Sequence, residues 1–411
     1  HALDERRFRA GQLGEVLRDR VSTEGRAWCG RVALCRYEID GEEGAQPGLE
    51  FMEVDGHGHE CTRLTTSTPR CHARPRHFMG SSMRVAVTGG TGFLGRAIVR
   101  ELVDQGSAPE EIRILARTTH PELDALGVIQ TGASILDASA LKAALEGVEV
   151  VYHLAGMVSR DPRDEEPMRR LHVEGTRAVL SASHAAGAKR LVYASSSGTI
   201  GCFETPDGIA DHSAAFCDDL THRWPYYVTK IAAERALQAY FRKHAFPVIS
   251  LNPSLILGPG DDRVSSTGDV KLFLDGKLPS IPRGGLSYVD VRDLAPVFVR
   301  AATEGEVGTR YPLGAKNCLV SEFLNDLERL SGQKGPRLRL PKSVELLGAR
   351  VSAALLRTFG MTPDFDYETA QMSQLYWYID SERSKRDLGF CPRASDETLS
   401  DTISDLRARH G

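Results

Sequence analysis

The stretch VTGGTGFLG, residues 87–95, constrains the fold of this chain more than any other part of its sequence. A short apolar run precedes it and a helical pattern follows it, so Gly89, Gly92 and Gly95 lie where a predicted strand meets a predicted helix. At such a junction the first glycine permits a tight turn, the second lets the backbone approach a pyrophosphate, and the third lets the helix pack closely on the strand. The helix then presents free N–H groups and its positive dipole end to the phosphates. The loop therefore predicts a dinucleotide site at the first strand of an α/β domain.

From Met83 onward, short β-rich runs alternate with helical ones. The runs are apolar on both faces, as buried parallel strands are, and the segments between them have apolar residues every three or four positions. This alternation predicts an α/β fold with a Rossmann-type doubly wound parallel sheet. The predicted strands are 84–89, 112–117, 148–156, 190–196 and 246–253.

The chain divides into three compositional regions. Residues 1–82 show poor apolar periodicity and predict an irregular N-terminal extension, either weakly ordered or not native to the protein, because Met83 is a natural start. Residues 83–253, together with 286–302, form the expected NAD(P)-binding Rossmann domain. Residues 254–285 and 303–411 are expected to form a smaller, mostly helical substrate lobe.

The extension also contains side chains that could imitate a zinc site, but their spacing is irregular and we expect no metal. These side chains are His57, His59, Cys61, Cys71 and His72.

Composition excludes several classes of partner. Apolar residues make up 41%, charged residues 26% and the net charge is −4, which disfavours a nucleic-acid partner. No apolar run approaches the roughly 20 residues that span a bilayer, and no signal peptide is apparent, so we expect a cytoplasmic protein without a transmembrane segment. The eight cysteines lack the regular spacing of a disulfide framework, which favours reduced thiols.

The choice of cofactor depends on the end of the second strand. An NAD site usually has Asp or Glu there, whereas this chain has Arg117. A cation suits a 2′-phosphate, so NADP(H) is favoured as the cofactor and NAD(H) is possible. The alternative interpretation of Arg117 is a solvated arginine at the end of a strand. Asp137, after a predicted third strand, is a candidate for binding the adenine amino group.

The stretch PYYVTKIAAER carries the candidate catalytic pair. Tyr226 and Lys230 are four residues apart and share one face of a helix. A neighbouring ammonium and an oxidised nicotinamide would lower the pKa of the tyrosine, which could then exchange a proton with a substrate oxygen. Serines of the stretch YASSSGTIG, residues 193–201, follow a parallel strand, and one of them could hydrogen-bond the reacting carbonyl.

Together these motifs resemble the extended short-chain dehydrogenase/reductase family from Met83 to about Gly411. The matching stretches are TGGTGFLG (88–95), VYHLAG (151–156), VEGT (173–176), ASSSGTIG (194–201), YYVTK (226–230), NPSLILGPGD (252–261), YVDVRDLA (288–295) and LGFCPR (388–393). The resemblance implies that Tyr226 is the proton donor or acceptor and that Lys230 binds ribose and modifies the tyrosine pKa. It implies Ser196 as the catalytic serine, with Ser197 as its rival.

The resemblance also implies a cofactor site. Gly156 is expected beside the cofactor, and the other expected cofactor-binding residues are Gly89, Thr91, Gly92, Phe93, Leu94, Arg117, Asp137, Ala155, Tyr226, Lys230 and Asn252. A homodimer is possible, because helices beside strands four and five often form dimers in that family.

Within the family the chain is most similar to dihydroflavonol-reductase-like and hydroxysteroid-dehydrogenase-like members. The resemblance implies an NADP-dependent oxidoreductase acting on a ketone or secondary alcohol of an apolar small molecule. The alternative is a nucleotide-sugar epimerase or dehydratase with tightly bound NAD, which is disfavoured because Asn252-Pro253-Ser254 stands where such epimerases generally have Arg-Pro.

Two further features leave alternatives open. His172 replaces the usual asparagine of the pattern NVxGT, and it is either a proton relay or a histidine satisfied locally. The amphipathic segment 344–359 would line or cover the substrate lobe, and we expect a packed core helix rather than membrane contact. Its apolar positions are Val344, Leu347, Val351, Leu355 and Phe359.

Overall fold

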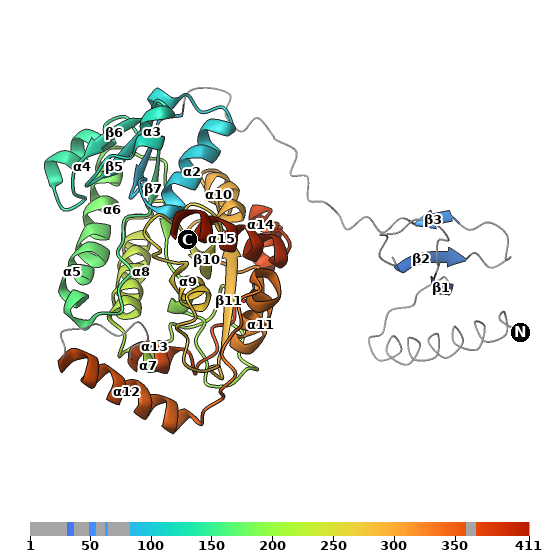
Figure 1. Cartoon of the computed structure of the whole chain (residues 1–411). Coiled ribbons are helices and arrows are strands. Elements are labelled where there is room, and N and C mark those ends of the chain that lie inside the picture. The colour runs from blue at the N-terminus through green and yellow to red at the C-terminus, as the bar shows by residue number, and fades with distance from the viewer. Residues whose placement is uncertain (1–30, 37–48, 55–61, 65–82, 359–366, 411) are drawn as a thin grey trace, which may run out of the picture. The chain divides into compact units, whose positions relative to one another are not determined.

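The computed structural model describes residues 31–36, 49–54, 62–64, 83–358 and 367–410 (Figure 1). The chain divides into two units, His1–Arg74 and Pro75–Gly411. In the described part of the first unit, β1 (Arg31–Arg36), β2 (Leu49–Val54) and β3 (Thr62–Leu64) form an antiparallel sheet. The histidines and cysteines considered as a zinc site, His57, His59, Cys61, Cys71 and His72, lie outside the described residues.

The second unit is built on a parallel sheet of seven strands within its described residues, in the order β12-β9-β8-β7-β4-β5-β6. This confirms the predicted Rossmann-type sheet. The strand bounds are β4 Val85–Thr88, β5 Ile112–Ala116, β6 Ile129–Gly132, β7 Val150–His153, β8 Arg190–Ala194, β9 Val248–Pro253 and β12 Arg310–Leu313.

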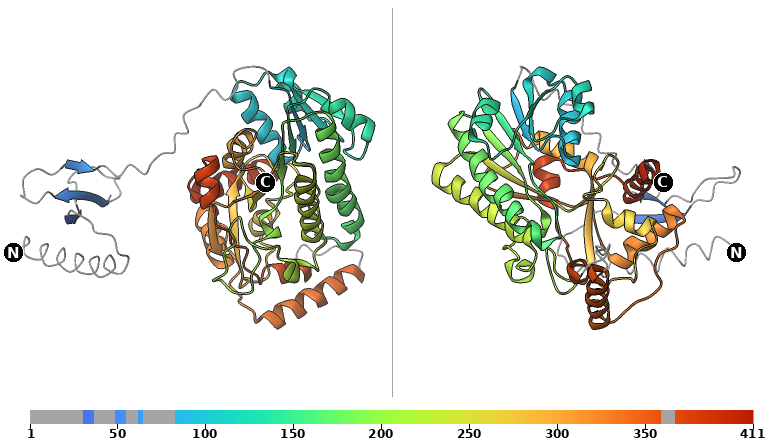
Figure 2. Two further views of the ribbon diagram at one scale, coloured as in Figure 1. Left: turned by 180° about the vertical axis from the view of Figure 1, so that it is seen from behind. Right: turned by 60° about the vertical axis from the view of Figure 1, so that its left-hand side comes forward.

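Helices cover both faces of this sheet because the strand side chains alternate between two apolar clusters (Figure 2). Val85 and Val87 of β4 face the cluster formed with α2 (Phe93–Asp104), α10 (Val291–Arg300) and α14 (Glu382–Leu388). Ala86, between them, faces the cluster formed with the helices of the opposite layer. That layer contains α4 (Ala138–Leu145), α6 (Gly175–Ala185) and α8 (Pro225–His244).

Short helical turns connect these larger elements. They are η1 Pro109–Glu111, α3 Pro121–Ala125, η2 Pro162–Asp164, α5 Glu165–Arg169, η3 Arg170–Glu174, η4 Ser197–Thr199 and α7 Asp218–Thr221. Among them η3 is a π-helical turn between α5 and α6, a geometry that is often found at functional sites.

The substrate lobe has its own small sheet, in which β11 (Gly285–Asp290) pairs with β10 (Leu255–Leu257) and β13 (Lys316–Leu319). The packed helices α9 (Gly268–Leu274), α11 (Val320–Ser331) and α15 (Ser395–His410) bury a separate apolar cluster with this sheet. The remaining helices among the described residues are α12 (Lys342–Thr358) and α13 (Tyr367–Met372).

The structure corrects the expected boundary between the two lobes. Strand β12 belongs to the seven-stranded sheet, although residues 303–411 were expected in the substrate lobe. Within 286–302, β11 joins the lobe sheet, whereas α10 packs in the Rossmann layer beside α2. α10 buries its apolar side chains in the Rossmann cluster, whereas β11 contributes to both cores, with Val289 in the Rossmann cluster and Tyr288 in that of the substrate lobe.

The expected core helix at 344–359 is also corrected. Val344, Leu347 and Val351 of α12 are 49%, 63% and 59% exposed, and Leu355 and Phe359 lie among residues whose side chains are not described. Glu345 and Ala349 are the buried positions of its described turns. Among the described residues, no helix is long and apolar enough to cross a membrane.

Candidate active site

The glycine loop follows β4 in the middle of the sheet, where the chain order reverses. β4 pairs with β5 on one side and with β7 on the other, so the loop opens at the crevice where α/β sheets bind ligands. Gly89 has a φ of +73°, and a Cβ there would lie 2.8 Å from the backbone of Ala155. A Cβ on Gly95 would lie 2.5 Å from the carbonyl oxygen of Gly89. Both positions therefore require glycine.

The start of α2 suits an anionic group. Gly92 is its N-cap and provides no side-chain cap, and the first turn contains no acidic residue. The unsatisfied N–H groups at this helix end are thus available to phosphate oxygens. Gly89, Gly92, Phe93 and Leu94 all line one pocket, and this cradle fits a dinucleotide pyrophosphate.

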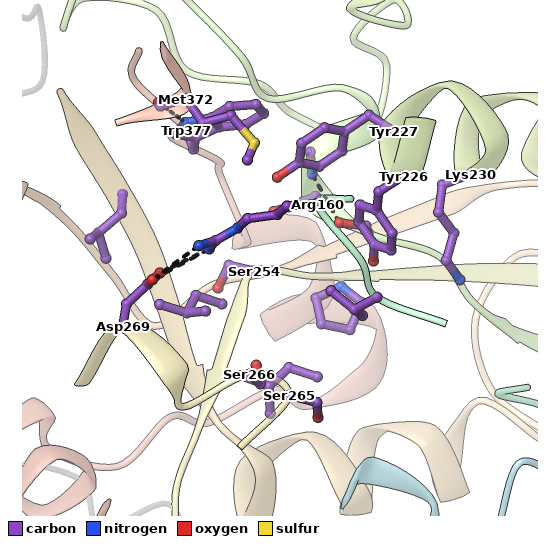
Figure 3. Close-up of a pocket in the computed structure, with 18 of the residues that line it drawn as sticks. Arg160, Tyr226, Tyr227, Lys230, Ser254, Ser265, Ser266, Asp269, Met372 and Trp377 are labelled. Carbon is purple, nitrogen blue, oxygen red and sulfur yellow. Dashed lines mark hydrogen bonds and ion pairs between the residues drawn. The ribbon is translucent and has the colours of Figure 1, made fainter. Parts of the chain in front are cut away.

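Tyr226 and Lys230 lie on the first two turns of α8, which starts at Pro225, a residue well suited to the first helical position. Figure 3 shows the two side chains next to each other. Lys230 is 6% exposed, its Nζ donates to the carbonyl oxygen of Ala194 at 2.9 Å, and it lies 5.1 Å from the ring centroid of Tyr193. Burial lowers the pKa of Lys230 to about 8, while the charge of Glu234 acts in the opposite direction.

The pKa of Tyr226 moves opposite to the expectation from sequence. Burial raises the pKa of its phenol, and a hydrogen bond with Ser196 partly offsets this effect. The expected lowering included the charge of an oxidised nicotinamide, whereas the shift found here comes from the protein alone. In this environment Tyr226 holds its proton at neutral pH, which suits a general acid.

The three consecutive serines have different surroundings. The hydroxyl of Ser195 is buried and donates a hydrogen bond to Glu234, so it is not directed at Tyr226. Ser196 is half-buried, lines the pocket and reaches Tyr226. Ser197 also lines the pocket but is only 6% exposed, and it begins the short turn η4. This geometry favours Ser196 over Ser197 as the partner of Tyr226.

Behind the serines lies a buried polar cluster that sequence reasoning missed. Glu234 is completely buried and accepts hydrogen bonds from Ser195, Thr199 and Asn252, and it forms an ion pair with Arg310 of β12. Glu234 comes one helical turn after Lys230, so its face was predictable. The pairing of Glu234 with Arg310 could not be predicted from sequence, because only the sheet order brings β12 near α8.

Asn252 does not lie where the cofactor site was expected. It is completely buried, and its Nδ2 donates to the carbonyl oxygen of Ser196 at 3.2 Å and to Glu234 at 3.0 Å. Its side chain therefore supports the serine loop from behind and presents no surface to a ligand.

His172 lies in η3 and is satisfied on both ring nitrogens. Nε2 accepts a hydrogen bond from the backbone N–H of Met157 at 3.0 Å, so Nδ1 carries the proton and donates to Thr229 Oγ1 at 2.8 Å. Thr229 in turn donates to the carbonyl oxygens of Pro225 and Tyr226. Burial lowers the pKa of His172 to about 2, so it stays neutral. Of the two alternatives, the structure supports a locally satisfied histidine that ties the β7 loop to the start of α8.

The other predicted cofactor residues are more dispersed. Arg117 is exposed just beyond the end of β5. Asp137 caps α4, with Oδ1 accepting from the backbone N–H groups of Ser139 and Ala140, which accounts for its acidic side chain without a ligand. Thr91 is 7% exposed, and Ala155 packs beside Gly89 without lining the pocket.

The pocket itself is continuous, with a volume of about 470 Å³. It extends from the glycine cradle past Ser196 and Tyr226 into a chamber with mostly apolar walls. Figure 3 shows Arg160 crossing it toward Asp269, to which it is bonded at 3.2 Å, while Tyr227 stacks on Trp377 with ring centroids 4.9 Å apart. The apolar walls include Trp224, Leu255, Ile256, Leu278, Leu286, Val320, Phe323, Leu324 and Met372.

A doubly wound parallel sheet with a glycine cradle and a serine–tyrosine–lysine group at its crevice defines a dinucleotide-binding α/β protein of the oxidoreductase type. Comparison with known proteins agrees, because the model of the NAD dependent epimerase/dehydratase family matches residues 85–314. The chain belongs to this family and is an enzyme of the extended short-chain dehydrogenase/reductase type.

Relatives with sequence similarity have names of reductases and sterol-metabolising proteins. The chain is 31% identical to sterol demethylase protein B of Methylococcus capsulatus over 80% of this chain and 99% of the relative. It is 29% identical to a putative dihydroflavonol 4-reductase of Synechocystis over 80% of this chain and 95% of the relative.

Solved structures share the fold. A UDP-glucose 4-epimerase of Thermus thermophilus in complex with NAD has a TM-score of 0.62 at 22% identity, covering 79% of this chain and 99% of the epimerase. The crystal structure of gox2253 has a TM-score of 0.69 at 30% identity, covering 80% and 99%.

Proposed function

We propose that this enzyme is an NADP-dependent oxidoreductase that transfers hydride between nicotinamide and a ketone or secondary alcohol of an apolar small molecule. The observation that carries the proposal is the continuous pocket, in which the Ser196–Tyr226 pair lies between a phosphate cradle and an apolar chamber. Such a chamber disfavours a strongly polar substrate such as a nucleotide sugar, because burying unpartnered hydroxyl and phosphate groups is costly.

The roles of the side chains follow from their contacts. Bound NADP(H) supplies or accepts the hydride. In the direction of reduction, the phenol of Tyr226 gives its proton to the substrate oxygen while the hydroxyl of Ser196 hydrogen-bonds the same oxygen. The ammonium of Lys230, held by the carbonyl oxygen of Ala194, supports the phenolate that remains. Trp224, Tyr227 and Trp377 also line the pocket, and we expect their rings to limit the access of water to this exchange.

Arg117 is the residue that we assign to the 2′-phosphate of NADP(H). It is exposed and follows the second sheet strand in the chain, β5, next to the glycine loop strand β4. Within the described residues its guanidinium has no acidic partner, so it is available for a phosphate. Asp137 remains a candidate adenine ligand only through the carboxylate oxygen that does not cap α4.

The names of relatives support an apolar substrate. They include sterol demethylase protein B and the 2-alkyl-3-oxoalkanoate reductase of Stenotrophomonas maltophilia, whose names refer to a sterol and to an alkyl-substituted oxoalkanoate. We therefore propose a hydroxyl or oxo compound with a large apolar body as the substrate class.

Mass spectrometry of nucleotide released from protein purified without added cofactor tests this proposal. We expect an empty protein that binds NADPH more tightly than NADH in a titration, with Arg117→Ala weakening NADPH alone. Arg242→Ala, an exposed arginine on α8, is the matched control and should change neither affinity. Stoichiometric bound NAD would instead support an epimerase or dehydratase that recycles its cofactor, and equal loss of both affinities would refute the assignment of Arg117.

A further inference from the structure

Residues 334–352 form an outward-facing surface that combines cations with apolar side chains, here called the basic–apolar surface. Val344, Leu347 and Val351 form one row on α12, and Leu338, before the helix, is 53% exposed. Figure 1 shows α12 at the outer edge of the lobe, away from the seven-stranded sheet. The exposed cations of the surface are Lys334, Arg337, Arg339, Lys342 and Arg350.

The charge of this surface has a single sign. Within 334–352 the one acidic residue, Glu345, is 4% exposed and points inward, where it accepts hydrogen bonds from Ser280 and Gln374. Of the cations, Arg337 pairs with Glu328 of α11, and Arg350 lies over the ring of Tyr367. Every exposed charge of the segment is therefore positive.

The burial pattern of α12 over residues 342–352, where its side chains are described, is the reverse of that expected for a helix with an apolar face buried in the core. In its described turns a carboxylate and a small alanine, Glu345 and Ala349, face the protein, while Val344, Leu347 and Val351 face outward. The hydrogen bonds that Ser280 and Gln374 donate to Glu345 favour this orientation of the helix, in which the apolar row faces solvent. An apolar row flanked by cations is the pattern of helices that lie in a membrane interface.

We propose that the basic–apolar surface docks on an anionic lipid bilayer, with Leu347 and its neighbours in the acyl boundary and the cations at the headgroups. A second copy of the chain fits less well, because a symmetric contact would bring Lys334, Arg339 and Lys342 near the same cations of the other copy. The proposal depends only on exposure and charge, and it stands independently of the proposed function.

The position of α12 gives this docking a consequence for substrate access. α12 packs against α13, and Met372 at the end of α13 lines the apolar chamber from the other side. Leu278 and Pro282, close in sequence to the Ser280 that bonds Glu345, also line the chamber. Docking would thus bring the bilayer near elements that form one wall of the apolar chamber.

Co-sedimentation of the full chain with vesicles tests the proposal. We expect binding to vesicles of equal parts phosphatidylcholine and phosphatidylglycerol, and little binding to phosphatidylcholine alone. Leu347→Glu should weaken binding by about tenfold or more, because it removes a buried side chain from the interface. Lys342→Glu should weaken it by at least about fivefold, and added salt should weaken it further.

Matched controls separate docking from general effects. Ile129→Glu alters an exposed apolar side chain on β6, and Lys142→Glu reverses an exposed charge on α4; neither should change vesicle binding. Thermal unfolding and NADPH binding of every variant should stay as in the unaltered chain, which excludes misfolding. Absence of binding to anionic vesicles, or Leu347→Glu binding as well as the unaltered chain, overturns the proposal. A dimer in solution that Leu347→Glu dissociates, without vesicle binding, would assign the surface to a second copy instead.

Discussion

Tyr226 is the side chain on which the proposed reaction depends most directly. Replacing it with phenylalanine removes the exchangeable proton while keeping the ring, so we expect kcat to fall by about 10²- to 10⁴-fold. Cofactor affinity, measured by titration, should stay unchanged. Tyr240→Phe makes the same chemical change farther along α8 and should retain turnover. If Tyr226→Phe also retains full turnover, Tyr226 is not the proton donor.

The buried histidines make stability depend on pH. Burial lowers the pKa of His172 to about 2 and that of His153 to about 3, whereas an unfolded histidine titrates near 6.5. Below pH 6.5 the unfolded chain therefore binds protons that the folded chain does not, and the free energy of unfolding falls as the pH falls. Each histidine contributes up to about 1.4 kcal/mol per pH unit.

His172→Asn should remove about half of this histidine-dependent slope. Urea unfolding between pH 6.5 and pH 5 measures it in a range where most carboxylates stay ionised. His222→Asn, at an exposed site, is the control and should leave the slope unchanged. An unaltered slope in His172→Asn would mean that the histidine is already protonated in the folded protein.

Among the secondary-structure elements, α8 and β12 are joined by a buried ion pair. Glu234 and Arg310 neutralise each other beneath the serine loop, with side chains 0% and 11% exposed. Removing one partner leaves the other charge buried, and we expect Glu234→Gln or Arg310→Met to cost about 3–5 kcal/mol each. The double variant should cost less than the sum, which a double-mutant cycle in urea measures. Strict additivity would show that the two side chains do not interact.

The same pair influences the catalytic site through Lys230. The charge of Glu234 raises the pKa of Lys230 against the effect of burial, so its loss should lower that pKa further below about 8. If the pH profile of kcat contains a transition caused by titration of Lys230, we expect Glu234→Gln to shift that transition toward lower pH. A loss of activity with an unmoved profile would assign Glu234 a purely structural role.

For the whole molecule, the division into units predicts how the chain responds to shortening. Among the described residues, the apolar clusters on both faces of the sheet, and that of the substrate lobe, are formed by residues of the second unit. A chain that begins at Pro75 keeps these three clusters, so we expect it to unfold within about 2 °C of the full chain. Differential scanning calorimetry and NADPH titration measure this. A lowered unfolding temperature would show that the first unit stabilises the second.

The local motifs were accessible from sequence because each depends on neighbours in the chain. The glycine loop needs only a strand before it and a helix after it, and Tyr226 and Lys230 need only the four-residue spacing of a helix. The alternation of strands and helices likewise predicted the parallel sheet. The motif also showed that His172 stands where asparagine is usual. The hydrogen bonds of His172 could not be predicted, because their partners Met157 and Thr229 are distant in the sequence.

Other assignments were made only by the tertiary structure, because they depend on which distant segments meet. Packing of α8 against the β8 and β9 loops turned Ser195 inward and Ser196 toward Tyr226, and it buried Asn252 behind them. Sheet order brought Arg310 to Glu234. The apolar row of α12 has the periodicity of a core helix, yet the inward bonds of Glu345 expose it. Periodicity determines that a helix has two faces, whereas the free energy of packing and polar pairing decides which face is buried.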